Sequence, residues 1–114
     1  MTAPVLAMTG ATGFVGGATM RLAVAQGWHV RALTRRPQPA QPCVTWIAGA
    51  LDQPEALAEL AAGSDVVLHI AGVVNVPTRA AFEAGNATAT GNVIDAARAA
   101  GVTRFVHVSS LAWA

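Results

Sequence analysis

A glycine-rich turn near the N-terminus constrains the fold more than any other stretch of the sequence. Gly10, Gly13 and Gly16 are spaced three residues apart, between an apolar run at 5–8 and an amphipathic stretch at 15–26. Glycine loses more backbone entropy on folding than other residues, so three in one turn indicate a close approach. A strand, a glycine turn and a helix in this order direct backbone N–H groups and the helix dipole at a phosphate. The stretch therefore predicts a phosphate-binding site at the start of the first helix.

Composition indicates one globular domain over residues 1–114, long enough to bury a core. Hydrophobic residues make up 54% of the chain and charged residues 11%, which favours an interior sheet covered on both faces. The net charge of +1 gives no support for a nucleic-acid or membrane-surface partner. No metal site is expected from the sequence.

The single cysteine and the apolar runs indicate in which cellular compartment the protein is expected. Cys43 has no second cysteine to pair with, and we expect it to act as a small hydrophobe before a strand. The N-terminus lacks the basic stretch and apolar core of a signal peptide. The longest apolar run, 66–74, contains His69 and is too short to span a bilayer. We therefore expect a cytoplasmic protein without a membrane segment.

Apolar runs alternate with helical patterns along the chain. The predicted strands are 5–8, 29–34, 44–48, 65–70 and 103–109. The predicted helices are 15–26, a short one that begins near Asp52, and 79–100. Strands and helices that alternate with short connections indicate an α/β fold with a parallel sheet and right-handed crossovers.

Each predicted helix carries an apolar stripe. The stripe of the first helix comprises Val15, Ala18, Leu22 and Ala25. In the second helix Asp52 is the expected N-cap and Pro54 lies in the first turn. The inner face of that helix is expected to carry Leu57, Leu60 and Ala61.

The spacing of the glycine turn resembles one particular superfamily. The run Thr9-Gly10-Ala11-Thr12-Gly13-Phe14-Val15-Gly16 lacks the Gly-Lys-Ser/Thr of a P-loop and the one-residue first gap of the commoner dinucleotide fingerprint. It resembles the T-G-x-x-G-x-x-G turn of the short-chain dehydrogenases/reductases, especially their extended and atypical branches. The resemblance implies a Rossmann-type three-layer domain with strand order 3-2-1-4-5, in which the turn wraps the cofactor pyrophosphate. The implied cofactor contacts are Gly10, Thr12, Gly13, Phe14 and Val15, and Gly16 allows close packing.

The end of the second strand bears on the choice of cofactor. NAD-specific sites usually place an acidic residue there, to bind the ribose 2′-hydroxyl. This chain has Arg35 and Arg36 instead, and a guanidinium can pair with the 2′-phosphate of NADP. The sequence thus favours NADP(H), with NAD as the alternative.

Two further segments resemble the family where it holds the adenine and ribose. Gly49-Ala50-Leu51 stands where relatives often have Gly-Asp-Leu, so the implied adenine contact passes to Leu51. His69-Ile70-Ala71-Gly72 resembles the family's His-x-Ala-Ala, whose small residues, here Ala71 and Gly72, lie against the ribose. His69 itself lies within a strand, and we expect a hydrogen-bonded core histidine rather than a catalytic one.

The last helix and strand continue the resemblance. Asn86 and Asn92 match the two asparagines of the family's Asn-Val-x-Gly-Thr-x-Asn-Val helix, and Asn86 is expected to tie that helix to the strand ends. The fifth strand ends in Ser109 and Ser110. By family register Ser110 would hydrogen-bond the substrate carbonyl or hydroxyl as a catalytic residue, with Ser109 beside the cofactor.

The family's catalytic Tyr-x-x-x-Lys pair has no counterpart, because the chain contains no tyrosine and all seven of its basic residues are arginine. We therefore expect a fragment, truncated before the C-terminal strands and the substrate lobe, of an NAD(P)-dependent epimerase, dehydratase or reductase with a small-molecule substrate. The alternative is a non-catalytic regulatory or complex-associated subunit. A methyltransferase-type domain fits less well, since its tighter glycine spacing and its acid after the second strand are missing. The apolar fifth-strand edge suggests association, for example as a homo-oligomer.

Overall fold

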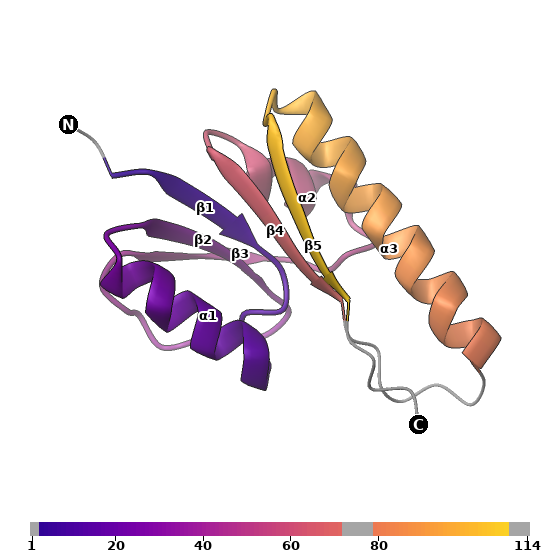
Figure 1. Ribbon diagram of the computed structural model, residues 1–114, viewed down its shortest axis with the longest axis horizontal. Coiled ribbons are helices and arrows are strands. Elements are labelled where there is room, and N and C mark those ends of the chain that lie inside the picture. Colours follow the sequence, from indigo (N-terminus) through magenta and orange to yellow (C-terminus); the bar gives the residue numbers. More distant parts are fainter. Residues whose placement is uncertain (1–2, 72–78, 110–114) are drawn as a thin grey trace.

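Five parallel strands form the middle layer of the computed structural model, which describes residues 3–71 and 79–109 (Figure 1). The strands are β1 (Val5–Met8), β2 (His29–Thr34), β3 (Val44–Ala48), β4 (Val66–Ala71) and β5 (Arg104–Ser109). Helix α1 (Phe14–Ala25) packs on one face, and α2 (Pro54–Ala61) and α3 (Arg79–Ala99) pack on the other. The order β3-β2-β1-β4-β5 confirms the predicted three-layer topology.

The central strand β1 determines where a ligand can bind. It pairs with β2 on one side and with β4 on the other, so the strand order reverses direction between β1 and β4. In open parallel sheets, ligands bind in the crevice outside the carboxyl ends of the strands at this reversal. The glycine turn leaves β1 at that point.

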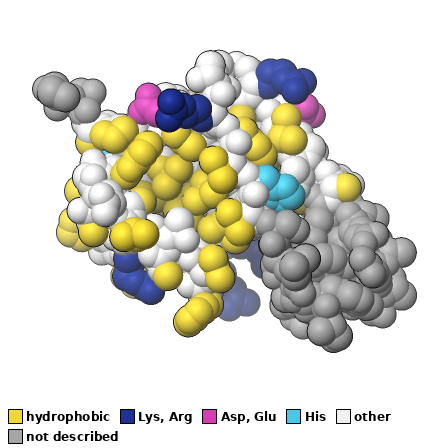
Figure 2. Space-filling model, in the orientation of Figure 1, with side chains coloured by type: hydrophobic (Ala, Val, Ile, Leu, Met, Phe, Trp, Pro, Cys, Tyr) yellow, Lys and Arg dark blue, Asp and Glu magenta, His cyan; other side chains and the backbone are white. Residues whose placement is uncertain are grey.

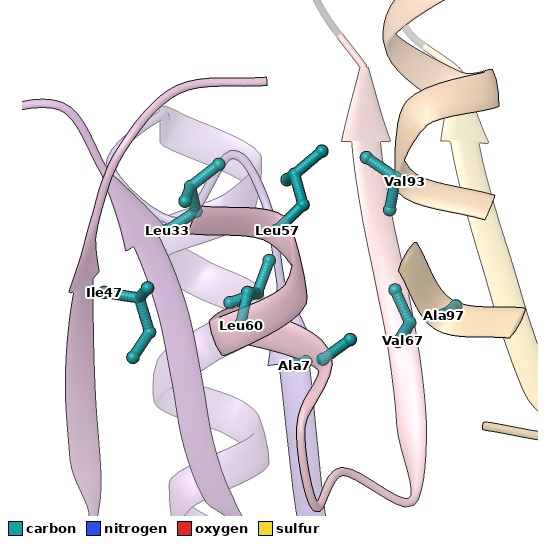
Figure 3. Packing of buried hydrophobic residues seen from close by; sticks show 9 residues of the cluster. Ala7, Leu33, Ile47, Leu57, Leu60, Val67, Val93 and Ala97 are labelled. Carbon is teal, nitrogen blue, oxygen red and sulfur yellow. The ribbon is translucent and has the colours of Figure 1, made fainter. Parts of the chain in front are cut away.

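The larger core cluster lies between the sheet and helices α2 and α3 (Figure 3). The prediction for the inner face of α2 is confirmed, because Leu57, Leu60 and Ala61 are all buried there. They meet Val93 and Ala97 of α3 above the strands. Each fully buried leucine side chain contributes roughly 1.5–3 kcal/mol to stability, so this layer fixes α3 relative to the sheet.

Helix α1 packs through a different face from its apolar stripe. Val15 and Leu22 of that stripe are 55% and 61% exposed, whereas Gly16, Gly17 and Met20 are buried. The glycines allow the helix backbone itself to approach the chain that precedes it, and this contact orients the helix. Met20, with Ala23 and Val24, continues this face into the core, so the inner stripe of α1 is not the predicted one.

Two local predictions are wrong. Asp52 does not cap α2: the helix begins at Pro54 with Gln53 at the N-cap, and no side chain bonds to the cap. The chain instead makes a turn in which the Gln53 N–H donates to the Ala50 carbonyl at 3.1 Å, which shifts the start by one residue. Cys43, expected to act as a small hydrophobe before a strand, is exposed and has a positive φ of 63°.

Strand β5 forms one edge of the described sheet and pairs only with β4 there. Val106 and Val108 of this strand are exposed, and Figure 2 shows hydrophobic side chains gathered on the face that carries α1. Association through this edge stays a prediction. No helix in the described ranges has the length and apolar character needed to cross a membrane.

Candidate functional site

The glycine turn leads directly into α1, and within the turn the Gly13 N–H donates to the Gly10 carbonyl at 3.2 Å. Gly13 occupies the N-cap position in an extended conformation, and no side chain bonds to this end of the helix. Thr12, Gly13, Phe14 and Val15 are exposed, and the Phe14 side chain is 94% accessible. Because the first N–H groups of a helix have no partner within it, this turn is suited to an anion.

Close contacts among the described residues explain why positions 10 and 16 are glycine. They do not explain why position 13 is glycine. A Cβ on Gly16 would lie 1.7 Å from the Gly10 carbonyl oxygen. A Cβ on Gly10 would lie 2.9 Å from the Ile70 carbonyl oxygen, and Gly10 has a φ of +74°. A Cβ on Gly13 would meet only ordinary contact, 3.5 Å from the Gly10 oxygen. Packing within residues 3–71 and 79–109 therefore does not require glycine at position 13, whereas a ligand pressed against the backbone would.

A buried hydrogen bond joins the base of the turn to β4. The Thr9 hydroxyl and Nδ1 of His69 share a hydrogen bond at 2.7 Å, and the same hydroxyl accepts the Ile70 N–H at 3.1 Å. The Thr9 N–H also donates to the Leu68 carbonyl at 3.0 Å. These contacts fix the glycine turn against the carboxyl end of β4, so the two walls of the crevice have a defined separation.

His69 is the buried histidine that the sequence predicted. It is 0% exposed and stacks on His107 of β5, with ring centroids 5.3 Å apart. Burial, and secondarily the nearby His107, lower the pKa of His69 from 6.5 to about 4. The imidazole is thus neutral at pH 7, and its Nδ1 is hydrogen-bonded to the Thr9 hydroxyl. Its Nε2 has no hydrogen-bond partner among residues 3–71 and 79–109.

The end of β2 is held by Thr34. The buried Thr34 hydroxyl donates to the Arg36 carbonyl at 2.6 Å and accepts the Arg36 N–H at 3.3 Å. Arg35 and Arg36 are exposed beyond this turn. The first acidic residue of the sequence is Asp52, so positive charge prevails in the part that forms the turn and β2. An anionic ligand would be favoured there.

The loop after β3 is fixed to its neighbours. The Gly49 N–H donates to the Thr34 carbonyl at 2.9 Å, which joins the loops after β2 and β3. The side chain of Asn92 on α3 donates to the Leu51 carbonyl at 3.0 Å. Leu51 therefore lies at the same end of the sheet as the arginine turn. Sequence reasoning did not anticipate the contacts of Thr9 and Thr34, and matched Asn92 only as a motif residue.

Several predicted site residues cannot be placed as side chains. Gly72 and Ser110 lie outside the described residues. Ala71 and Ser109 pair in register as the last residues of β4 and β5, which brings their backbones together, but the description does not include their side chains. The same holds for the side chain of Asn86 within α3. In the described ranges, no cluster of three histidine, cysteine or acidic side chains could hold a metal ion.

Comparison with known proteins shows that this chain is similar to proteins that bind nicotinamide dinucleotides. Residues 10–114 match the family described as NAD(P)H-binding. The chain is 42% identical over 113 residues to a ceramide reductase of Caulobacter vibrioides, covering 95% of this chain and 35% of that protein. It is 38% identical over 108 residues to a 4-hydroxy-2-methyl-3-oxo-4-farnesyl-3,4-dihydroquinoline-1-oxide ketoreductase of Stigmatella aurantiaca, covering 90% and 32%. The chain thus spans about a third of the length of these curated relatives.

Solved structures agree with the sequence relatives. A short-chain dehydrogenase/reductase superfamily protein from Agrobacterium tumefaciens, with bound NAD, superimposes with a TM-score of 0.72 at 31% identity. The match covers 93% of this chain and 32% of that one. The shared region is the part of the fold that contains the glycine turn and the five strands.

Proposed function

Because this chain belongs to the NAD(P)H-binding family, we propose that it forms the cofactor half of an NAD(P)-dependent oxidoreductase that reduces a carbonyl group of a small molecule. The similarity to a ceramide reductase and a ketoreductase favours a reductase over an epimerase or dehydratase. Gly13 is the observation that carries the proposal. Packing among the residues that the structure describes does not explain why position 13 is glycine, whereas a pyrophosphate against the turn would explain it.

Different residues at the carboxyl ends of the strands would bind different parts of the dinucleotide. The N–H groups of the glycine turn would hold the pyrophosphate, and the arginine turn after β2 would face the adenosine ribose. The loop with Leu51 would contact the adenine. The bound nicotinamide would supply the hydride, and Ser110 would orient the substrate carbonyl. With no tyrosine and no lysine, we expect the 114 residues by themselves not to catalyse hydride transfer.

The first test changes Gly13 to alanine. The free energy of unfolding should stay within about 1 kcal/mol of wild type, because the added methyl meets only ordinary contact. The Kd for NADPH should rise at least tenfold, roughly 1.4 kcal/mol, since the methyl occupies space that the pyrophosphate needs. Calorimetric titration and urea unfolding of the same samples measure both quantities. A wild-type chain that binds neither NADPH nor NADH would refute the proposed function.

The second test concerns the choice between NADP and NAD, for which we propose that Arg35 binds the 2′-phosphate. Arg35→Ala should raise the Kd for NADPH about tenfold, the loss of a charge-assisted hydrogen bond of roughly 1.5 kcal/mol. The Kd for NADH should not change. Arg21→Ala, which removes an exposed arginine from α1, is the matched control. Equal wild-type affinity for the two cofactors would contradict the assignment.

A further inference from the structure

Helix α3 reaches the loop after β3 through a single described side-chain hydrogen bond. Nδ2 of Asn92 donates to the carbonyl oxygen of Leu51 at 3.0 Å, across 41 residues of sequence. Both residues are half-buried. The bond therefore connects the layer of helices behind the sheet to a loop at its ligand-binding edge.

The other described hydrogen bonds of this loop involve Gly49, Ala50 and Gln53, and the described partner of the Leu51 carbonyl is Asn92. The Gly49 N–H is held by the Thr34 carbonyl at 2.9 Å, and the Ala50 N–H donates to Oε1 of Gln53 at 2.9 Å. Close packing also fixes the start of the loop, since a Cβ on Gly49 would lie 2.2 Å from the Ala56 Cβ. The middle of the loop depends on the Leu51 side chain, which packs on the core, and on the bond from Asn92.

We infer that Asn92 is a positioning residue, which holds the 49–53 loop in the conformation that receives the adenine half of the dinucleotide. The inference rests on the proposed function, because it takes Leu51 as the adenine contact. Asn92 needs no contact with the cofactor for this role. Without its amide the Leu51 carbonyl loses its described partner, and the loop can leave its place while the glycine turn, held by Thr9 and Gly16, remains.

The expected effect is a selective loss of affinity. Asn92→Ala should raise the Kd for NADPH about fivefold, the equivalent of one hydrogen bond of roughly 1 kcal/mol. Asn92→Asp should raise the Kd at least as much, because a carboxylate cannot donate to a carbonyl oxygen. Thr88→Ala, an exposed position on the same helix, should leave the Kd unchanged.

Nuclear magnetic resonance of the 114-residue chain can locate the effect. At saturating NADPH, wild type should show ligand-induced shifts at the amides of both 13–16 and 50–53. Asn92→Ala should keep the shifts at 13–16 and lose most of those at 50–53. A residue that merely stabilised the fold would reduce both sets together.

The possible results distinguish a failure of the Asn92 inference from a failure of the proposed cofactor-binding function. Absence of NADPH binding by the wild-type chain would overturn the proposed function and this inference with it. Binding by wild type together with an unchanged Kd for Asn92→Ala would overturn only the role of Asn92. An equal loss of shifts at 13–16 and 50–53 would also overturn it, because Asn92 would then act on the whole site.

Discussion

Replacing Gly16 with alanine should abolish measurable NADPH binding and lower the free energy of unfolding by about 3 kcal/mol, near the upper end of overpacking costs. The new Cβ would lie 1.7 Å from the Gly10 carbonyl oxygen and 2.5 Å from its carbonyl carbon. Both are backbone atoms, so no side chain can rotate away. Either α1 moves away from the turn or the turn opens, and each response displaces the N–H groups that we propose to bind the pyrophosphate. Urea unfolding and calorimetric titration measure the two effects.

The neighbouring glycine provides the matched control for this substitution. A Cβ on Gly17 would have its nearest neighbours at 3.4 Å, the Ala11 carbonyl oxygen and a guanidinium nitrogen of Arg21. Gly17→Ala should therefore leave NADPH binding intact, and it should stabilise the chain by up to about 1 kcal/mol through helix propensity. If Gly16→Ala bound NADPH as tightly as Gly17→Ala, the described approach of α1 to the turn would be wrong.

The free energy of unfolding should fall by about 3 kcal/mol, through His69 alone, as the pH is lowered from 7 to 4. Burial, with a smaller contribution from His107, lowers the pKa of His69 from 6.5 to about 4 in the folded chain. Between pH 6.5 and 4, His69 is protonated in the unfolded chain but stays neutral in the folded chain. The contribution of neutral His69 to the free energy of unfolding is therefore fully present above pH 6.5, and it is lost as the pH falls toward 4.

Two variants isolate this contribution from that of the carboxylates. His69→Asn cannot titrate, so its stability should decline by about 3 kcal/mol less than that of wild type between pH 7 and 4. Thr9→Val removes the hydroxyl bonded to Nδ1 and keeps the buried imidazole. It should be less stable at every pH, yet retain most of the wild-type pH dependence. An identical slope for wild type and His69→Asn, from urea unfolding at a series of pH values, would contradict the lowered pKa.

Much of the fold could be predicted because the strands are short apolar runs bounded by glycine, proline or polar residues. β1, β2 and β3 have the predicted bounds, and β4 and β5 begin one residue later than predicted. The face of α1 was predicted wrongly because its first turn packs through Gly16 and Gly17, which have no side chain to mark the face that Met20 continues. The predicted NAD(P)-binding domain is confirmed by the family match over residues 10–114.

The site was predictable where its chemistry is local in sequence and not where it depends on register. The glycine turn follows from the spacing of three residues. The Thr9–His69 bond requires β1 and β4 to pair with Met8 opposite Leu68, a register that no local pattern specifies. The Asn92–Leu51 bond likewise depends on how α3 lies over the sheet. Hydrogen bonds between segments 41 to 60 residues apart are products of the whole topology.

The pairing of β1 with β4 also sets the moment at which this chain can first function. During synthesis the glycine turn leaves the ribosome early, but its supports, His69 and Ile70, follow about sixty residues later. A nascent β1–α1–β2 unit therefore has the phosphate-binding sequence without the wall that gives it shape. Such long-range pairing slows folding, because the intervening chain must close a large loop, at a cost in entropy, before β1 and β4 form any stabilising contact. Cofactor can stabilise this domain only after β4 has entered the sheet, so it can protect the completed fold but cannot guide the first steps of its formation.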